Sequence, residues 1–172
     1  MYGLREHHAD NLLKVELFMM YVVAVVVYAL DQILKAIVRT NMHIGESFPV
    51  LSPIVVIEYI RNPGGAFSIL PNSRWLFVVV AIAVTIVVIV ARYRWNPSVV
   101  GRLGLGFLLA GALGNMTDRV ISGTVVDYIY FKFINFPIFN LADMAVDAGI
   151  ILILIETFRK DRKNKGSDKE QS

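Results

Sequence analysis

Four long apolar stretches, separated by more polar segments, dominate the chain. The first, Leu17 to Leu30, contains no charged residue, and its apolar pattern continues past Asp31 and Lys35 to Val38. A helix rises about 1.5 Å per residue, so about 20 apolar residues cross the hydrocarbon core of a bilayer. The pattern therefore predicts an α-helical membrane protein with four transmembrane helices, over about residues 15–38, 75–91, 99–116 and 139–158.

The first long segment between these helices, 39–74, has a different pattern. Residues Ile54 to Arg61 are rich in β-branched side chains, which favour a strand. The sequence Asn62-Pro63-Gly64-Gly65 is typical of a turn, and we expect a return strand from Ala66 to Leu70.

The second such segment, 117–138, combines a further expected strand within Gly123 to Tyr130 with a group of aromatic residues. Aromatic side chains are enriched where a membrane meets water. We therefore expect a small extracytoplasmic β-platform that rests on the bilayer. The aromatic residues are Phe131, Phe133, Phe136 and Phe139.

Composition supports the membrane class. Of the 172 residues, 56% are hydrophobic, which is more than one small water-soluble core requires. We expect one polytopic membrane domain over residues 1–158, followed by a charged tail, 159–172, without fixed structure. The basic residues of this tail suit anionic lipid head groups, so we expect membrane lipids rather than nucleic acid as its partner.

The basic residues also predict which side of the membrane each segment faces. With both termini inside, eleven Lys and Arg residues lie in inner segments and six in outer ones. Short inner loops rich in Lys and Arg are the usual orientation signal. We therefore expect both termini in the cytoplasm.

Polar side chains gather near the helix ends that would face the opposite, extracytoplasmic side. Carboxylates and amides at membrane depth are costly, so they are retained for function or for pairing with one another. These residues are Asp31, Asn115, Asp118, Asn140 and Asp143.

Two carboxylates near this face, Asp127 and Asp143, are candidates for acid–base chemistry. Asp143 follows Asn140 by three residues, which is the spacing of a capping box at a helix start, so a purely structural role is an equal alternative. Asp127 lies in the expected strand, where a lone Asp is usually a turn residue or a surface charge. If the chain brings the two carboxyls together, one would be protonated and the other ionised, which is what activation of a water requires.

Other charged residues have simpler interpretations. Asp31 and Lys35 are four residues apart, so a structural ion pair is favoured over support of the site. Asp118 and Arg119 suggest a charge pair that holds the end of the third helix. Asp147 lies one helical turn beyond Asp143 and needs a partner or water that the sequence does not identify.

Metal and nucleophile chemistry finds little support. The chain has no cysteine, His7 and His8 lie in the N-terminal tail, and His43 stands alone in a loop. No His cluster is available for a metal, and no glycine-rich loop precedes a helix in a phosphate-binding pattern. We therefore expect carboxylate chemistry without a metal or another cofactor.

Five motifs stand in order over about residues 31 to 147. They are Asp31-Gln32-Ile33-Leu34-Lys35, Arg61-Asn62-Pro63-Gly64-Gly65-Ala66-Phe67, Gly111-Ala112-Leu113-Gly114-Asn115 with Asp118-Arg119, Val125-Val126-Asp127-Tyr128, and Phe139-Asn140-Leu141-Ala142-Asp143. Each motif is weak alone, but five in order within a chain of this length are specific. Together they resemble the motifs of the lipoprotein signal peptidases, which are bacterial membrane aspartyl enzymes.

The resemblance implies removal of signal peptides from diacylglyceryl-modified prolipoproteins, by a cut immediately before the lipidated cysteine, at the bacterial cytoplasmic membrane. It implies Asp127 and Asp143 as the catalytic pair in a site near the extracytoplasmic face, and we expect a monomer. Residues that would bind substrate or support the site are Asn62, Gly64, Asn115, Asp118, Arg119, Asn140, Ala142, Asp31 and Lys35.

The chain departs from the family pattern at three positions. Gly65 stands where Ala is common, Tyr128 where Phe is common, and Met144 where a small polar residue is frequent. None removes a catalytic group, so we expect them to affect substrate preference.

Two other classes remain as alternatives. A small proton- or cation-coupled transporter subunit would also place carboxylates in the membrane, but stretches such as 76–91 and 148–155 contain no charged residue to continue a path inward. A non-catalytic adaptor that presents the β-platform to a partner would leave the five motifs unexplained.

Overall fold

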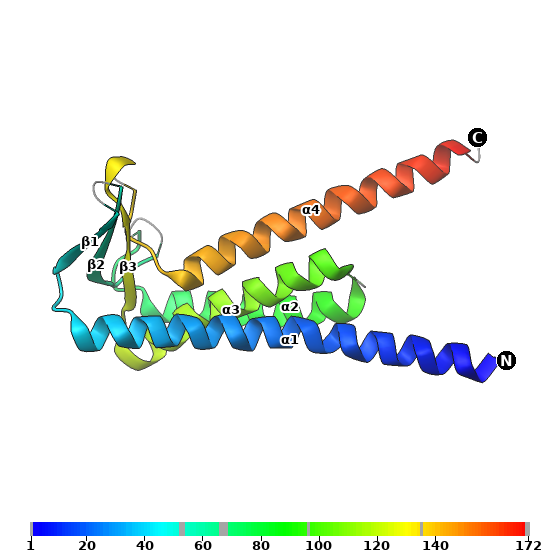
Figure 1. Ribbon diagram of the computed structural model, residues 1–172, viewed down its shortest axis with the longest axis horizontal. Helices are drawn as coiled ribbons and strands as arrows, with labels where there is room; N and C mark the ends of the chain where they lie inside the picture. The colour runs from blue at the N-terminus through cyan, green and yellow to red at the C-terminus, as the bar shows by residue number, and fades with distance from the viewer. Residues whose placement is uncertain (1, 52–53, 66–68, 96, 135, 171–172) are drawn as a thin grey trace.

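Four helices and a small sheet make up the described part of the chain, which is residues 2–51, 54–65, 69–95, 97–134 and 136–170 of a computed structural model. The helices run side by side, the sheet lies at one end, and both termini lie at the other (Figure 1). In chain order, the elements are α1 Tyr2–Asn41, β1 Ser47–Leu51, β2 Val55–Asn62, α2 Arg74–Arg94, α3 Val99–Ser122, β3 Val125–Phe131, the short 3-10 helix η2 Lys132–Ile134, and α4 Leu141–Glu170.

Three of the helices are long and apolar enough to cross a membrane: α1 from Phe18 to Asn41, α2 and α3. This confirms the expected class, a mostly helical membrane protein with a small antiparallel sheet. The apolar part of α4 carries Asp143, Asp147 and Glu156, so its length and composition do not establish a fourth span.

Helix α3 is the centre of the bundle, since it packs against α1, α2 and α4. Small residues let it approach α4 closely: a Cβ atom added at Gly149 would lie 2.7 Å from the backbone nitrogen of Leu108 and 2.8 Å from the carbonyl oxygen of Gly104. An apolar core that includes Met20, Val88 and Leu105 joins α1, α2 and α3 in the same half of the bundle.

The sheet has the order β1-β2-β3 and is antiparallel throughout. Both strands expected from β-branched residues form, as β2 and β3. The backbone of Ile129 in β3 also exchanges two hydrogen bonds with Phe139, at N···O distances of 2.8 and 3.0 Å. This contact holds the start of α4 against β3, which brings Asp127 and Asp143 to the same corner of the molecule.

The return strand expected at residues 66–70 falls partly outside the described residues, because these exclude 66–68. Ile69 and Leu70 are described, and they are not in a strand. β2 pairs instead with β1, which precedes it, and with β3, which is more than 60 residues later in the chain.

Two helices are longer than their apolar stretches. α3 continues past Met116 to Ser122 and ends at Gly123, whose φ of 79° supplies the left-handed helix cap. α4 continues to Glu170, so the expectation that the tail from Arg159 lacks fixed structure was wrong as far as Glu170. The tail contains no proline, and six of its fourteen residues are Lys or Arg, which extend an existing helix readily.

Candidate active site

The first turn of α4 carries Asp143 in the capping arrangement that the sequence indicated. The backbone N–H of Asp143 donates to Asn140 Oδ1, and the backbone N–H of Asn140 donates to Asp143 Oδ2, both at 3.0 Å. Asn115 Nδ2, from α3, donates to the other carboxylate oxygen at 2.7 Å. Asp143 is therefore fixed in position at a helix N-terminus, where the helix dipole stabilises a negative charge.

Asp127 lies on β3 with its side chain almost fully buried, at 2% exposure. Its carboxyl group accepts hydrogen bonds from Asn140 Nδ2 at 2.6 Å and from Asn62 Nδ2 at 3.0 Å. Burial and, to a smaller extent, the nearby charge of Asp143 raise the pKa of Asp127, whereas the two amide hydrogen bonds and the charge of Lys35 lower it. The balance leaves the pKa of Asp127 raised, at about 7. Asp127 can therefore hold a proton near neutral pH.

Two asparagines connect the carboxyl groups. Asn140 uses its side-chain N–H to bind Asp127 and its backbone N–H to bind Asp143. Asn140 Nδ2 also lies 3.2 Å from Asn115 Oδ1, and Asn115 in turn donates to Asp143. The structural and the acid–base interpretations of Asp143 are therefore compatible, because the same capping group also binds the second carboxyl.

The turn after β2 forms one side of the site. Gly64 N–H donates to Asn62 Oδ1 at 2.9 Å, and the carbonyl of Gly64 accepts from Arg119 Nη2 of α3 at 2.8 Å. The Arg119 guanidinium carbon lies 4.7 Å from the centre of the Phe77 ring. Gly65 also approaches Phe77, since an added Cβ atom would lie 2.7 Å from the ring. Arg119 therefore joins this turn to α2 and α3.

Behind the two carboxyls lies a buried charged cluster centred on Lys35. Its ammonium nitrogen is 2.9 Å from Asp31 Oδ2, 3.1 Å from Asp118 Oδ2 and 3.0 Å from Asn115 Oδ1. The Asp31–Lys35 ion pair is the one expected from their spacing. Asp31 Oδ1 accepts the backbone N–H of Ala142 at 2.9 Å, so this cluster also holds the start of α4.

Asp118 does not form the charge pair expected with its neighbour Arg119. It accepts instead from Arg39 Nη2 at 2.9 Å and contacts Lys35, and it also accepts the backbone N–H of Val126. Sequence reasoning missed Arg39. Its spacing of four residues from Lys35 was the available signal, because it places Asp31, Lys35 and Arg39 on one face of α1.

Small residues let α4 come close enough for these contacts. Ala142 is fully buried, and a Cβ atom added at Gly114 would lie 2.6 Å from Asp31 Oδ2 and 3.1 Å from the Ala142 side chain. Any larger residue at either position would push α4 away from Asp31 and Asn115.

The structure thus brings all eleven candidate residues to one end of the bundle, in two connected layers. Asp127, Asp143, Asn62, Asn115 and Asn140 share hydrogen bonds directly, and Gly64 and Arg119 attach to them through the turn. The second layer is Asp31, Lys35, Asp118 and Ala142. Asp147 is not part of either layer, and its side chain is exposed.

Chemically, this arrangement is an acid–base pair. The pKa of one carboxyl is raised to about 7, a second carboxyl lies at a helix N-terminus, and amide side chains fix both. Such a pair can take a proton from water and donate another to a polarised carbonyl.

The comparisons with known proteins agree on one family. The family model described as signal peptidase (SPase) II matches residues 23–159. A lipoprotein signal peptidase of Brevibacillus brevis is 40% identical over 146 residues, which are 84% of this chain and 98% of that protein. One of Halothermothrix orenii is 36% identical over 144 residues, with coverages of 84% and 98%.

Two solved structures, both described as bacterial membrane enzymes studied by the in meso method, have the same fold. The first, at 2.3 Å resolution, is 37% identical with a TM-score of 0.80, over 86% of this chain and 91% of that one. The second, at 1.9 Å resolution, is 36% identical with a TM-score of 0.74, over 80% of this chain and 90% of that one.

Proposed function

The chain belongs to the signal peptidase II family, and from that premise we propose that Asp127 and Asp143 are its catalytic pair. The protein is a bacterial membrane aspartic peptidase that removes signal peptides from prolipoproteins. The observation that carries our assignment is Asn140, which donates one hydrogen bond to each carboxyl group.

In the proposed reaction, ionised Asp143 accepts a proton from a water molecule while that water attacks the scissile carbonyl carbon. Protonated Asp127 donates a hydrogen bond to the carbonyl oxygen and stabilises the negative charge that develops there. When the intermediate collapses, a carboxyl proton passes to the departing amine. The raised pKa of Asp127, about 7, supports its assignment as the acid at neutral pH.

The remaining residues have positioning roles in this proposal. Asn115 and Asn140 hold the two carboxyls, and Asn62 binds Asp127 while it organises the turn that contains Gly64. Asp31, Lys35 and Asp118 fix α1, α3 and the start of α4 relative to one another. Ala142 allows the close approach, and Arg119 attaches the turn.

We further infer that the substrate carries a diacylglyceryl group on the cysteine that follows the scissile bond. A lipidated cysteine is anchored in the bilayer, which delivers the bond to the membrane boundary where the two carboxyls lie. The exposed apolar side chains of the sheet and of η2, which include Phe48, Phe133 and Ile134, support a sheet that rests on the lipid surface. No metal or other cofactor is required, and one copy of the chain supplies every proposed catalytic group.

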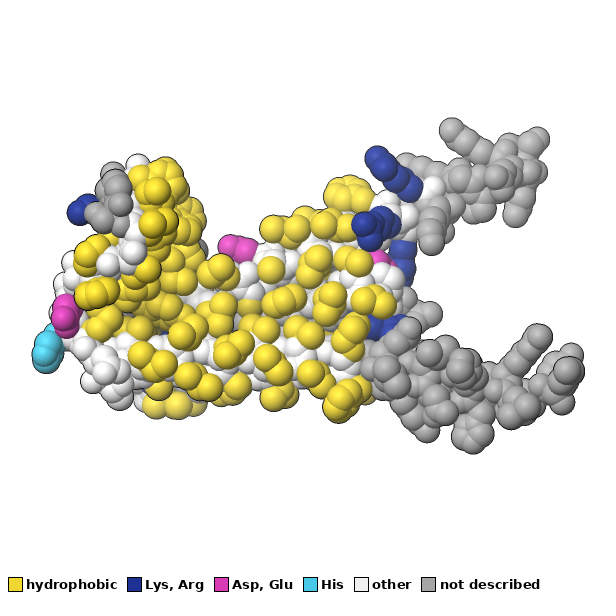
Figure 2. Space-filling model, in the orientation of Figure 1, with side chains coloured by type: hydrophobic (Ala, Val, Ile, Leu, Met, Phe, Trp, Pro, Cys, Tyr) yellow, Lys and Arg dark blue, Asp and Glu magenta, His cyan; other side chains and the backbone are white. Residues whose placement is uncertain are grey.

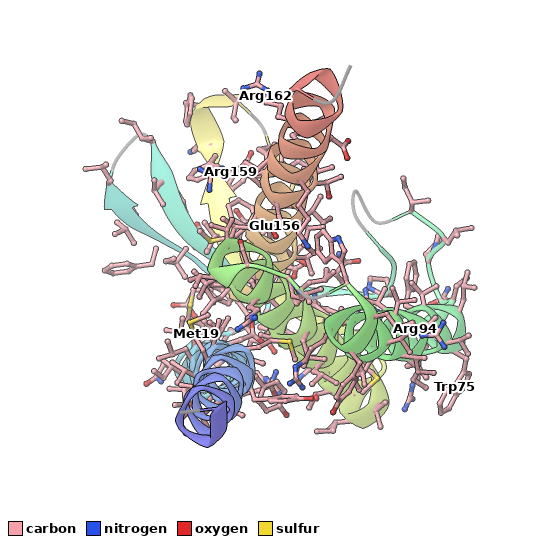
Figure 3. All side chains as sticks on the ribbon, turned by 90° about the vertical axis from the view of Figure 1, so that its right-hand side faces the viewer. Met19, Trp75, Arg94, Glu156, Arg159 and Arg162 are labelled. Atoms are coloured by element: carbon pink, nitrogen blue, oxygen red, sulfur yellow. The ribbon has the colours of Figure 1, made fainter. Side chains whose placement is uncertain are left out.

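The proposed orientation has both termini in the cytoplasm and the site at the outer face. Both termini lie at the end of the bundle opposite the sheet (Figure 1). Basic side chains gather at that same end (Figure 2), and those labelled there include Arg94, Arg159 and Arg162 (Figure 3). This is the distribution that the positive-inside rule predicts.

The direct test is replacement of each carboxyl by the isosteric amide, which cannot exchange the proton. We expect Asp127→Asn and Asp143→Asn each to lower cleavage of a diacylglyceryl prolipoprotein by at least about 100-fold, with normal thermal unfolding in detergent. Asp161→Asn, which removes an exposed carboxylate from the far end of α4, is the matched control and should cleave normally. Cleavage by either site variant at a rate close to that of the control would refute the assignment.

A further inference from the structure

Asp147 is a charged side chain that the proposed reaction does not use. It lies on α4, four residues beyond Asp143, and its side chain is exposed on a part of the helix whose other exposed residues, such as Met144 and Ile150, are apolar. Among the described residues, its carboxylate has no hydrogen-bond or ion-pair partner. The buried carboxylates of the bundle, such as Asp31 and Glu156, all have such partners. An ionisable group without a partner on an apolar stretch of helix is a candidate for a functional contact.

Asp147 lies on one face of α4, between Asp143 on its N-terminal side and the lining of an apolar groove on its C-terminal side. Spacings of three and four residues place side chains in line along a helix. Asp143 and Asp147 are therefore followed on the same face by Ile150, Leu154 and Thr157, which line the groove.

This α2–α4 groove has a volume of about 440 Å³ and is almost entirely apolar. Helices α2 and α4 form its two sides and α3 forms its floor, as the view along the bundle shows (Figure 3). The residues that α2 and α3 contribute include Val87, Ala91, Leu105 and Leu108.

The groove lies at a distance from Asp143 that the apolar segment of a bound signal peptide can reach. Ile150 and Thr157 lie seven and fourteen residues past Asp143, or about 10 and 21 Å along the helix axis. The apolar region of a signal peptide has about 7–15 residues, which as a helix is about 10–22 Å long. A substrate whose scissile bond is at the two carboxyls can thus place this region in the groove, and its chain must pass Asp147 on the way.

We propose that Asp147 is a specificity-determining residue, whose carboxylate accepts a hydrogen bond from a donor side chain of the bound signal peptide. The inference rests on the proposed function of Asp127 and Asp143. Asp147 is about 6 Å beyond Asp143 along the helix, a distance covered by about two extended or four helical residues of the substrate. The donor, a Ser, Thr or Lys side chain, therefore lies two to four residues before the scissile bond.

The test is cleavage of diacylglyceryl-modified signal-peptide substrates that carry Leu, Ser or Lys at each of these three positions in turn. For wild type, we expect kcat/KM at one position to be about tenfold higher with Ser or Lys than with Leu, because only these donors pair with the carboxylate. Asp147→Leu should bring all three substrates to within about twofold of one another. Asp147→Asn, which accepts a hydrogen bond without charge, should keep the preference for Ser and lose the preference for Lys.

Asp161→Asn is the matched control, and it should retain the wild-type ratios. Equal ratios in wild type and Asp147→Leu would overturn the role of Asp147, and so would a change in rate that is uniform across the substrates, as a contact with lipid would produce. The substrates with Leu test the proposed function alone, because Leu offers no hydrogen bond to Asp147. If wild type cleaves them but the ratios do not depend on Asp147, only this inference fails, whereas no cleavage of any substrate overturns both.

Discussion

At the scale of single residues, the site is built from side chains that each satisfy more than one partner. Asn140 caps α4 and binds both carboxyl groups, and Lys35 places its one charge between two carboxylates and an amide. Buried polar groups are tolerated only when they are hydrogen-bonded, so these residues depend on one another. Loss of one partner should therefore affect catalysis or stability far more than the loss of a single surface contact.

Asn140→Ala should lower cleavage by about 100-fold, because Asp127 loses a hydrogen-bond donor, the backbone N–H of Asp143 loses its capping acceptor, and small displacements of reacting groups cost that much. The measurement is kcat with a prolipoprotein substrate in detergent. Asn41→Ala, at the exposed end of α1, is the control and should leave kcat unchanged. If both variants cleave equally well, Asn140 does not position the carboxyls.

The pH dependence of cleavage should follow the proton on Asp127. Its pKa is raised to about 7, so the form with one protonated and one ionised carboxyl persists up to that pH and is lost as pH rises through it. We expect kcat/KM to fall on the alkaline side with an apparent pKa near 7. The profile should be measured between about pH 5 and 9, and a flat profile from pH 6 to 9 would contradict Asp127 as the acid.

The same raised pKa has a consequence for stability. An ordinary Asp ionises near pH 4, so between about pH 4 and 7 the folded protein retains a proton that the unfolded chain has released. The contribution of Asp127 to stability should therefore decrease as pH rises through this window and stay constant above it.

At the scale of helices and strands, the sequence predicted positions better than partners. The apolar stretches and the β-branched runs identified α1 to α4, β2 and β3, because periodicity and propensity are local properties. Which residues contact one another is set by the tertiary fold and not by a local property of the sequence. Asp118 contacts Arg39 and Lys35, some 80 residues earlier, rather than the adjacent Arg119, since neighbours in a helix point in different directions. Likewise, β2 pairs with β1 and β3, whereas the turn sequence Asn62-Pro63-Gly64-Gly65 predicted a partner strand directly after it.

The candidate residues were recoverable because their motifs resemble a family, and not because spacing alone identified a site. On spacing, Asp143 was equally a helix cap and Asp127 an ordinary strand residue. The three-dimensional fact that unites them is the pair of backbone hydrogen bonds between Ile129 and Phe139, which no local pattern predicts. Arg39 was missed for the same reason, because its value depends on where α3 places Asp118.

Lys35→Met should destabilise the bundle strongly, because it leaves the buried Asp31 and Asp118 without their shared countercharge. Breaking a buried ion pair from one side costs about 3–5 kcal/mol. The measurement is the thermal unfolding midpoint in detergent. Arg39→Met is the comparison: its side chain is 29% exposed and contacts only one of the two carboxylates, so its midpoint should fall less. Equal midpoints for Lys35→Met and wild type would show that the cluster contributes little.

At the scale of the whole molecule, polar chemistry, apolar contact and basic charge occupy successive levels along the bundle. Asp127 lies on β3 and Asp143 in the first turn of α4. Beyond the sheet, apolar side chains cover the helices, and basic side chains follow at the far end (Figure 2). At that end Glu156 accepts the backbone N–H of Ser98 at 2.9 Å and pairs with Lys160, so α4 is tied to the start of α3. The two ends of the bundle are thus held by separate contacts.

Truncation after Lys160 should preserve cleavage. It removes residues about 27 Å or more from Asp143 along α4 and keeps the contacts of Lys160 with Glu156 and Trp95. We expect kcat/KM within about twofold of wild type in detergent. A deeper truncation after Thr157, which removes Lys160, is the comparison and should lower the unfolding midpoint. Loss of activity in the shorter truncation, with normal membrane insertion, would show that the tail acts on the site.

The orientation can be tested with single cysteines, because the natural chain has none. Glu46→Cys lies in the exposed turn before β1, beside the sheet, whereas Asp161→Cys lies near the far end of α4. If the basic end faces the cytoplasm, a membrane-impermeant maleimide applied from outside should label Cys at position 46 in intact spheroplasts. It should label Cys at position 161 only after the membrane is opened. The reverse pattern would place the two carboxyls on the cytoplasmic side, where a translocated lipoprotein precursor could not reach them, and would contradict the substrate assignment as well as the orientation.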